Sequence, residues 1–269
     1  MAVNTTAGTG SEATRSVVLT DGTTDTKFLL VASSVVPAVA VEDPELTLTL
    51  PPSHTAFTGI DALTHAVEAL VSVHSYRLPA DLARSAIRTI GRWLPVAWGN
   101  GDDIEARTEM LTAQLQAGQA FTNASVALVH GMARPLGAQL HLPHGLANGL
   151  LLPYVTAFSA AAAPARYAEV ARLLGAADED TPDRRAAREA APAIRQLCED
   201  VSLYGYVGSF GEVPDREAYL EAVPGMAEDA VASGSPANNP RKPTAAEIEE
   251  LFVELYDDAL AGARERKDC

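Results

Sequence analysis

One run of seventeen residues, Val129–Gly145, constrains the fold of this chain more than any other stretch. It contains three of the six histidines, His130, His141 and His144, and it is interrupted by proline and glycine. These breakers predict a helix that ends near Arg134, a turn, and a new helix that starts close to His144. Histidines on either side of such a break can converge on one point. Because neutral imidazole is the commonest metal ligand, the run predicts part of a metal site.

A second pair of candidate ligands lies in the stretch Thr58–Ala69. Asp61 and His65 are four residues apart, so on a helix they project from one face, one turn apart. With His130 and His144 they would form a cluster of one carboxylate and three imidazoles, which suits divalent iron or zinc. Two plainer alternatives stay open at this point. The Asp61–His65 pair is also typical of a surface hydrogen bond, and His130 of a histidine satisfied inside the core.

Six segments that follow one another along the chain carry a resemblance to a known family. They are Thr5–Glu12, Asp43–Thr47, Gly59–Glu68, Val129–Gly137, Leu142–Gly145 and Asn239–Arg241. Through them the sequence resembles the iron-containing (group III) alcohol dehydrogenases, which have a dehydroquinate-synthase-like fold. The resemblance implies a mostly α fold. It divides the chain into an α/β remnant of a dinucleotide-binding domain, with short strands, at residues 1–52, and an all-helical metal-binding domain at residues 53–269.

The same resemblance implies the chemistry of the protein. A divalent metal, usually iron but with zinc as an option, would bind at the Asp-His-His-His cluster. A hydride would pass between a small alcohol and NAD or NADP, giving an aldehyde or ketone. The residues implied as metal ligands are Asp61, His65, His130 and His144, and those implied as cofactor contacts are Thr5, Thr6, Thr9, Lys27 and Leu46.

The position of a proton relay differs from the family pattern. Many members have a second histidine four residues after the first one in the Val129–Gly137 segment, and here that position is Arg134. Arginine does not release a proton in the working pH range. His141 is therefore the candidate for the catalytic relay, with a plain surface histidine as the alternative. Arg134 itself would orient a substrate carboxylate or hydroxyl, or pair with an acid.

The cofactor site implied by the resemblance is incomplete in this sequence. The family's Gly-Gly-Gly-Ser phosphate loop has no counterpart, and there is no G-x-G-x-x-G or Walker-type loop. We therefore expect most of the dinucleotide-binding domain to be missing. Besides an alcohol dehydrogenase, two alternatives stay open: a sister activity such as glycerol dehydrogenase or maleylacetate reductase, and a non-catalytic, metal-binding remnant.

Charge and composition indicate which binding partners and which cellular compartment to expect. With 20 Lys+Arg against 35 Asp+Glu, the net charge is −15, which disfavours nucleic acid and anionic membranes as partners. No apolar run is long enough to span a membrane, and the N-terminus lacks the features of a signal peptide. The two cysteines, Cys198 and Cys269, form no motif. We expect a cytoplasmic protein without disulfides that acts on a small molecule, and a homo-oligomer agrees with the resemblance.

Local patterns predict the order of the elements. Ser16–Thr20 and Phe28–Ala32 predict an antiparallel hairpin, and Val35–Val41 a further strand. A boundary follows at Pro51–Ser53, where Ser53 or Thr55 would cap the next helix. Helical spacing then predicts helices over residues 55–73, 79–98, 104–124, 145–159, 160–177, 184–200 and 244–264, the last with a capping box formed by Thr244 and Glu247.

Overall fold

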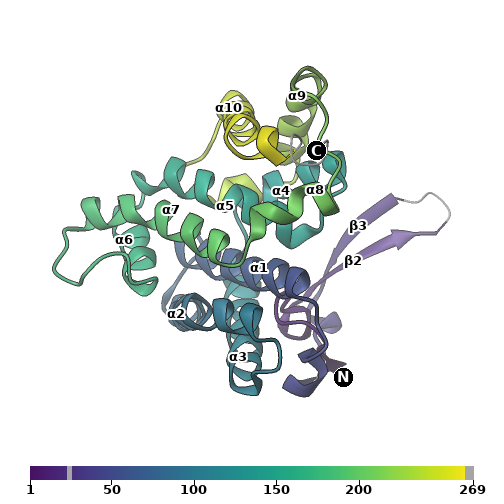
Figure 1. The fold of residues 1–269 in the computed structure, drawn as a ribbon, viewed down its shortest axis with the longest axis vertical. Coiled ribbons are helices and arrows are strands. Elements are labelled where there is room, and N and C mark those ends of the chain that lie inside the picture. Colours follow the sequence, from purple (N-terminus) through teal and green to yellow (C-terminus); the bar gives the residue numbers. More distant parts are fainter. Residues whose placement is uncertain (23–25, 264–269) are drawn as a thin grey trace.

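A computed structural model of the chain describes residues 1–22 and 26–263 (Figure 1). Helices make up most of these residues, so the predicted mostly α class is confirmed. The α-helices are α1 (Pro52–Val71), α2 (Arg77–Gly99), α3 (Ile104–Ala124), α4 (Leu128–Leu140), α5 (His144–Ala160), α6 (Pro164–Leu173), α7 (Asp183–Asp200), α8 (Val207–Phe210), α9 (Arg216–Ala232) and α10 (Ala245–Leu255). Short 3-10 turns are η1 (Ser11–Ala13), η2 (Ser33–Val35), η3 (Pro44–Thr47), η4 (Leu203–Tyr206) and η5 (Ser235–Asn238), and η6 (Tyr256–Leu260) is a π-turn.

The N-terminal part contains two small sheets. β2 (Ser16–Asp21) pairs antiparallel with β3 (Thr26–Val31), which confirms the hairpin, and this ribbon projects away from the helices (Figure 1). The strand predicted at Val35–Val41 is wrong for most of its length. Within this run only β4 (Ala40–Val41) is a strand, in parallel pairing with β1 (Ala2–Val3). Pro37 lies within the run, and a proline has no backbone N–H to donate to a sheet.

Helix α1 is the centre of the helical part. It packs against α2, α3 and α5, and from Thr55 to Val71 nearly every side chain is buried. A helix that is buried on all sides needs apolar residues all round, and α1 supplies them at Ile60, Leu63 and Leu70. The polar side chains that α1 also buries are therefore unusual, because a buried polar group needs a partner.

Three predicted helix boundaries are wrong. α4 does not end near Arg134 but continues to Leu140 with Pro135 inside it. Leu136 and Leu140 are fully buried, and their packing outweighs the backbone hydrogen bond that the proline removes. Neither Ser53 nor Thr55 caps α1; the Thr55 hydroxyl instead accepts a hydrogen bond from Arg107 at 2.8 Å. The third error concerns the helix predicted over residues 160–177. α5 still includes Ala160, and the next helix, α6, begins only at Pro164, a residue that is favoured in the first turn of a helix.

The other predicted helices match their segments closely, except the last, predicted over residues 244–264. There α10 ends at Leu255, η6 follows over Tyr256–Leu260, and residue 264 lies outside the described residues. α3 covers Ile104–Ala124 as predicted, and α5 begins at His144. α5 passes through Pro153, whose ring leaves the carbonyl of Gly149 without its helical donor; the Cys198 thiol donates to that carbonyl at 3.8 Å. The capping box at the start of α10 is confirmed, with Thr244 and Glu247 exchanging hydrogen bonds.

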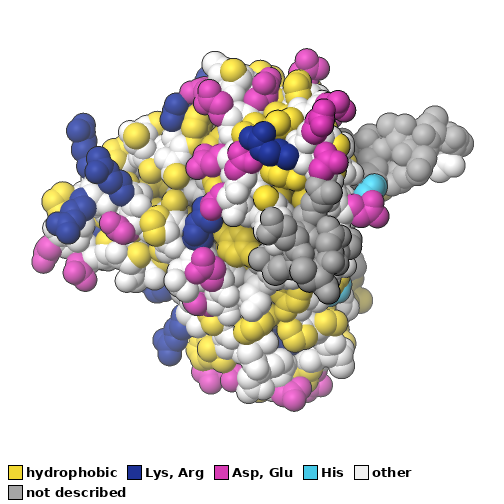
Figure 2. Space-filling model, turned by 45° about the horizontal axis from the view of Figure 1, so that its top comes forward, with side chains coloured by type: hydrophobic (Ala, Val, Ile, Leu, Met, Phe, Trp, Pro, Cys, Tyr) yellow, Lys and Arg dark blue, Asp and Glu magenta, His cyan; other side chains and the backbone are white. Residues whose placement is uncertain are grey.

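The surface of the molecule reflects its acidic composition. In Figure 2 acidic side chains are scattered over the visible face, whereas Lys and Arg gather mainly at its left side. No helix among residues 1–22 and 26–263 is long and apolar enough to cross a membrane.

Candidate metal centre

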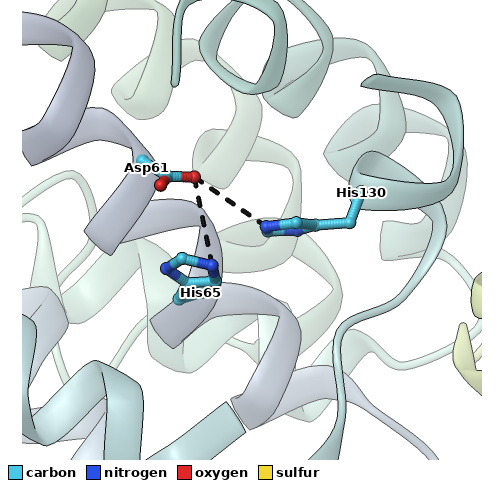
Figure 3. Close-up of side chains that lie close together, drawn as sticks. All are labelled: Asp61, His65 and His130. Carbon is cyan, nitrogen blue, oxygen red and sulfur yellow. Dashed lines mark ion pairs between the residues drawn. The ribbon is translucent and has the colours of Figure 1, made fainter. Parts of the chain in front are cut away.

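Three helices bring the predicted ligands together. Asp61 and His65 lie one turn apart on α1, and His130 lies near the start of α4 (Figure 3). His144 is the first residue of α5. The Asp61 Oδ1 atom is 3.7 Å from His144 Nε2, 3.8 Å from His130 Nε2 and 4.0 Å from His65 Nε2. The two stretches that suggested a metal site therefore meet around one carboxylate oxygen.

Burial closes the cluster on three sides. Asp61, His65 and His130 are 4%, 5% and 4% exposed, whereas the side chain of His144 is 51% exposed. The surface alternative for the Asp61–His65 pair is therefore wrong. The cluster is therefore open to solvent at His144.

Electrostatics holds the cluster in the ionisation state that binds metals. Burial lowers the pKa of His65 and lowers that of His130 well below the usual histidine value. Burial alone would raise the pKa of Asp61, but His65, His144, His130 and the amide of Asn148 outweigh it, and the net pKa is lowered. At neutral pH Asp61 is therefore a carboxylate and His65 and His130 are neutral imidazoles, and these are the forms that coordinate a metal ion.

Glu68 fixes the orientation of His130. One oxygen of its buried carboxylate lies 2.6 Å from His130 Nδ1, and the other accepts a hydrogen bond from the Val129 backbone N–H at 2.6 Å. Burial raises the pKa of Glu68 to about 7. A hydrogen bond at Nδ1 leaves the lone pair on Nε2, which faces Asp61. The sequence analysis missed this role, although Glu68 lies seven residues after Asp61 and therefore on the same helix face.

Asn148 is a second residue that the sequence analysis missed. Its Nδ2 atom is 2.6 Å from Asp61 Oδ1, 3.1 Å from His144 Nε2 and 3.3 Å from His130 Nε2. It lies one turn after His144 on α5, and this spacing was the available signal. Three acceptor atoms thus surround one donor, while the Asn148 Oδ1 atom is buried without a hydrogen-bond partner among the described residues.

The residues of the cluster fit a metal ion. Ligand atoms of Asp61, His65 and His130 lie within 4.8 Å of one another. Four ligands at about 2.1 Å from a tetrahedral ion would be about 3.4 Å apart, slightly closer than the 3.7 to 4.0 Å between the Asp61 oxygen and the three imidazoles. Small side-chain rotations close that difference. The His65 ring is held between Phe121, at 4.2 Å, and His130, at 4.6 Å between ring centroids.

The predicted cofactor contacts lie on the loop before η1 and on η3. Thr5 and Thr9 are exposed, Thr6 is half-buried, and Leu46 is 42% exposed. Lys27 lies in β3, and its side chain is outside the described part of the structure. Their role as cofactor contacts stays a prediction.

Glycines hold this loop against the helices. Gly10, at a φ of 60°, packs on the backbone of Gly118 in α3, where any Cβ would collide, and its N–H donates to Gln114 Oε1 at 2.9 Å. Gly8 packs in the same way against Thr58 of α1, one turn before Asp61. Gly118 is thus the point where α3 and this loop come into close contact.

His141, the predicted proton relay, lies apart from these contacts. It ends α4 in the left-handed conformation, with φ 53°, and it is exposed. Among the described residues it takes no part in the hydrogen bonds, ion pairs or ring contacts that connect the cluster. Its role stays a prediction.

Comparison with known proteins places the chain in a family. Residues 55–256 match the model of the Fe-containing alcohol dehydrogenase family, C-terminal. This chain belongs to that family. The chain is 41% identical over 256 residues to a 1,3-propanediol dehydrogenase of Citrobacter freundii, covering 95% of this chain and 65% of that protein. It is 35% identical over 252 residues to an NAD-dependent methanol dehydrogenase of Bacillus methanolicus, covering 94% of this chain and 65% of that protein.

The fold agrees with this membership. A crystal structure of a 1,3-propanediol oxidoreductase superposes with a TM-score of 0.87 at 39% identity, over 94% of this chain and 65% of that one. The chain therefore spans about two thirds of the length of these dehydrogenases.

Proposed function

We propose that this chain is the metal-binding part of an alcohol dehydrogenase that depends on a divalent metal and a nicotinamide cofactor. Asp61, His65, His130 and His144 would hold the metal, which is iron by family membership, with zinc as an option. The observation that carries the proposal is the convergence of three imidazole Nε2 atoms on Asp61 Oδ1, at 3.7 to 4.0 Å. A metal bound there supplies Lewis-acid polarisation of an alcohol or carbonyl oxygen.

The protein's own residues prepare this site in three ways. The Asp61 carboxylate supplies the negative charge that compensates a cation. Glu68 holds the His130 ring so that its Nε2 lone pair faces the cluster. The burial of His65 and His130 strengthens the electrostatic interactions at the site, whereas His144 leaves one side of it exposed.

The cofactor assignment rests on the relatives. One of them is named as NAD-dependent, and the names of both point to small alcohols as substrates. NAD or NADP would lie along the loop that carries Thr5, Thr6 and Thr9, with Lys27 and Leu46 beside it, and His141 would carry the proton. The position of the loop against α1, close to Asp61, supports this arrangement.

The metal is tested first. The chain is loaded with Fe2+ without oxygen, and bound metal is measured by elemental analysis and titration calorimetry. We expect one ion per chain, lost in Asp61→Ala and His130→Ala but retained in Asp81→Ala, which removes an exposed carboxylate from α2. Retention of the ion in both cluster variants would contradict the proposed ligands.

The cofactor is tested separately by titrating NADH into the metal-loaded chain and following nicotinamide fluorescence. Saturable binding that Thr9→Val or Lys27→Ala weakens would support the proposed contacts. One bound metal without NADH binding would instead support the alternative of a metal-binding unit that does not hold the dinucleotide on its own.

A further inference from the structure

A cavity of about 440 Å³ adjoins the buried side of the metal centre. His65 and His130 form part of its wall, and Phe121, which stacks on His65, adds an apolar surface. Its size is in the range of sites that hold small molecules. The remaining wall comes from distant parts of the chain: the start of the hairpin, the end of α3, and the turn that contains η5.

The charge of this cavity differs from that of the whole molecule. Two arginines, Arg15 and Arg134, line it, and none of the described lining residues is Asp or Glu. The whole chain contains 35 acidic residues against 20 basic ones. A purely cationic wall in so acidic a protein indicates a site for a negative group rather than the average composition.

The two arginines differ in their partners from the arginines that form ion pairs on the surface. Arg84, Arg172 and Arg216 each form ion pairs, with Glu169, Asp183 and Asp257. Among the described residues, by contrast, the guanidinium groups of Arg15 and Arg134 form neither ion pairs nor side-chain hydrogen bonds.

Arg134 interacts electrostatically with one carboxylate, that of Glu68. Its burial lowers the pKa of the guanidinium, and the charge of Glu68 partly offsets this effect. Both oxygens of Glu68, however, are occupied by His130 and the Val129 N–H. The donors of Arg134 therefore remain open to a ligand.

Several polar side chains of the cavity wall already form hydrogen bonds. Asn238 donates to the Ser125 hydroxyl and to the Val126 carbonyl, and Ser233 donates to Ala230. The Thr122 hydroxyl accepts from the Arg15 backbone N–H at 3.2 Å. The guanidinium groups are thus the strongest open donors of the cavity, and guanidinium matches the geometry of an oxyanion with two parallel hydrogen bonds.

We propose that this cavity selects alcohols or aldehydes whose far end carries an oxyanion, either carboxylate or sulfonate. Arg15 and Arg134 bind that group, Phe121 packs against the short carbon chain, and the hydroxyl end lies toward His65 and His130. The inference rests on the proposed dehydrogenase function and makes its substrate class specific.

The test measures binding apart from turnover. Ligand-detected NMR gives the Kd of 3-hydroxypropanoate, of 2-hydroxyethanesulfonate and of the neutral diol 1,3-propanediol for the metal-loaded chain. We expect wild type to bind at least one of the two anions more tightly than the diol, and the stronger anion identifies the oxyanion. Arg15→Gln or Arg134→Gln should reduce this preference by about tenfold. The control Arg77→Gln removes an arginine whose side chain is 95% exposed on α2, and should leave the preference unchanged.

The following outcomes overturn either the inference or the proposed function. Equal binding of the diol and both anions, or a preference that neither arginine variant changes, would show that the cavity does not select an oxyanion. Inorganic pyrophosphate serves as a further probe. If it binds with the same dependence on Arg15 and Arg134 while both hydroxyalkyl anions do not, the arginines serve cofactor phosphates instead. Arginine-dependent anion binding without hydride transfer to NAD would overturn the proposed dehydrogenase function and leave the oxyanion site standing.

Discussion

The metal centre and the N-terminal segment, residues 1–50, are held in place in opposite ways. Around Asp61 three helices enclose the side chains, and nearly every residue of α1 is buried. The N-terminal segment instead leaves large apolar side chains exposed, among them Val3, Leu19, Leu30, Val31, Val36, Val39 and Leu46. Its sheets have two strands each, which give little stability alone. The proposed ligand geometry therefore comes from the helical core, while the proposed cofactor contacts depend on a few specific hydrogen bonds.

The largest effect is expected where the core approaches the metal centre most closely. In Gly145→Val, a Cβ would collide with the carbonyl oxygen of Phe57 and lie 3.3 Å from the Asp61 Cβ. Because both contacts are with α1, we expect about 3 kcal/mol of lost stability and a loss of metal binding. Chemical denaturation measures the loss of stability, and elemental analysis measures the loss of bound metal.

The matched control is Gly225→Ala in α9, where nothing lies within 4 Å of an added Cβ. Alanine is the better helix former, so this variant should be as stable as wild type or slightly more so. A Gly145→Val protein with wild-type stability and metal content would refute the close packing of α5 on α1.

The next largest effect is expected from a variant that loosens the N-terminal segment but not the metal centre. Gln114 is fully buried; its Oε1 accepts from the Gly10 N–H, and its Nε2 donates to Glu12 at 3.0 Å and to Glu42 at 3.3 Å. Gln114→Ala leaves these groups unpaired, at a cost of about 2 kcal/mol. Hydrogen exchange should increase in residues 1–15 while metal affinity stays within about twofold of wild type. A parallel loss of metal would mean that the two regions are not independent.

A smaller effect is expected inside the metal centre itself. Glu68→Gln keeps the shape of the side chain but removes the charge that orients His130. Such partners of ligating histidines are typically worth about 10- to 100-fold in metal affinity. Titration calorimetry with Zn2+ measures the change, and Glu169→Gln, which removes a carboxylate from a surface ion pair, is the control. Equal affinities for both variants would show that His130 needs no such partner.

The sequence predicted the helical core better than the N-terminal segment for a physical reason. Helical spacing around Asp61 and His65, and the break before His144, are local signals, and both were confirmed as structure. The end of α4 was not predictable from Pro135, because burial of Leu136 and Leu140 outweighs the local preference of proline. Glu68 and Asn148 were missed because their roles appear only when three helices meet.

The N-terminal segment is also where the smallest effect, a dependence on pH, is expected. Burial, and then the charge of Glu12, raises the pKa of Glu42 to about 7, although hydrogen bonds from Asn4 and Gln114 act in the opposite direction. Between pH 4.5 and 7 the folded protein therefore binds a proton at Glu42 that the unfolded chain releases. The stability contributed by this proton is complete below pH 4.5 and is lost as the pH rises through 7.

Glu42→Gln removes this dependence because the amide carries no charge at either pH. Since Glu42 is only half-buried, solvent screening limits the difference to about 1 kcal/mol between pH 5 and pH 8. Urea denaturation of wild type and variant at both pH values gives the comparison, with Glu45→Gln as the exposed control. Wild type should lose stability relative to Glu42→Gln as the pH rises. The opposite sign would mean that Glu42 is ionised in the folded protein, and that the hydrogen bonds from Asn4 and Gln114 stabilise the carboxylate.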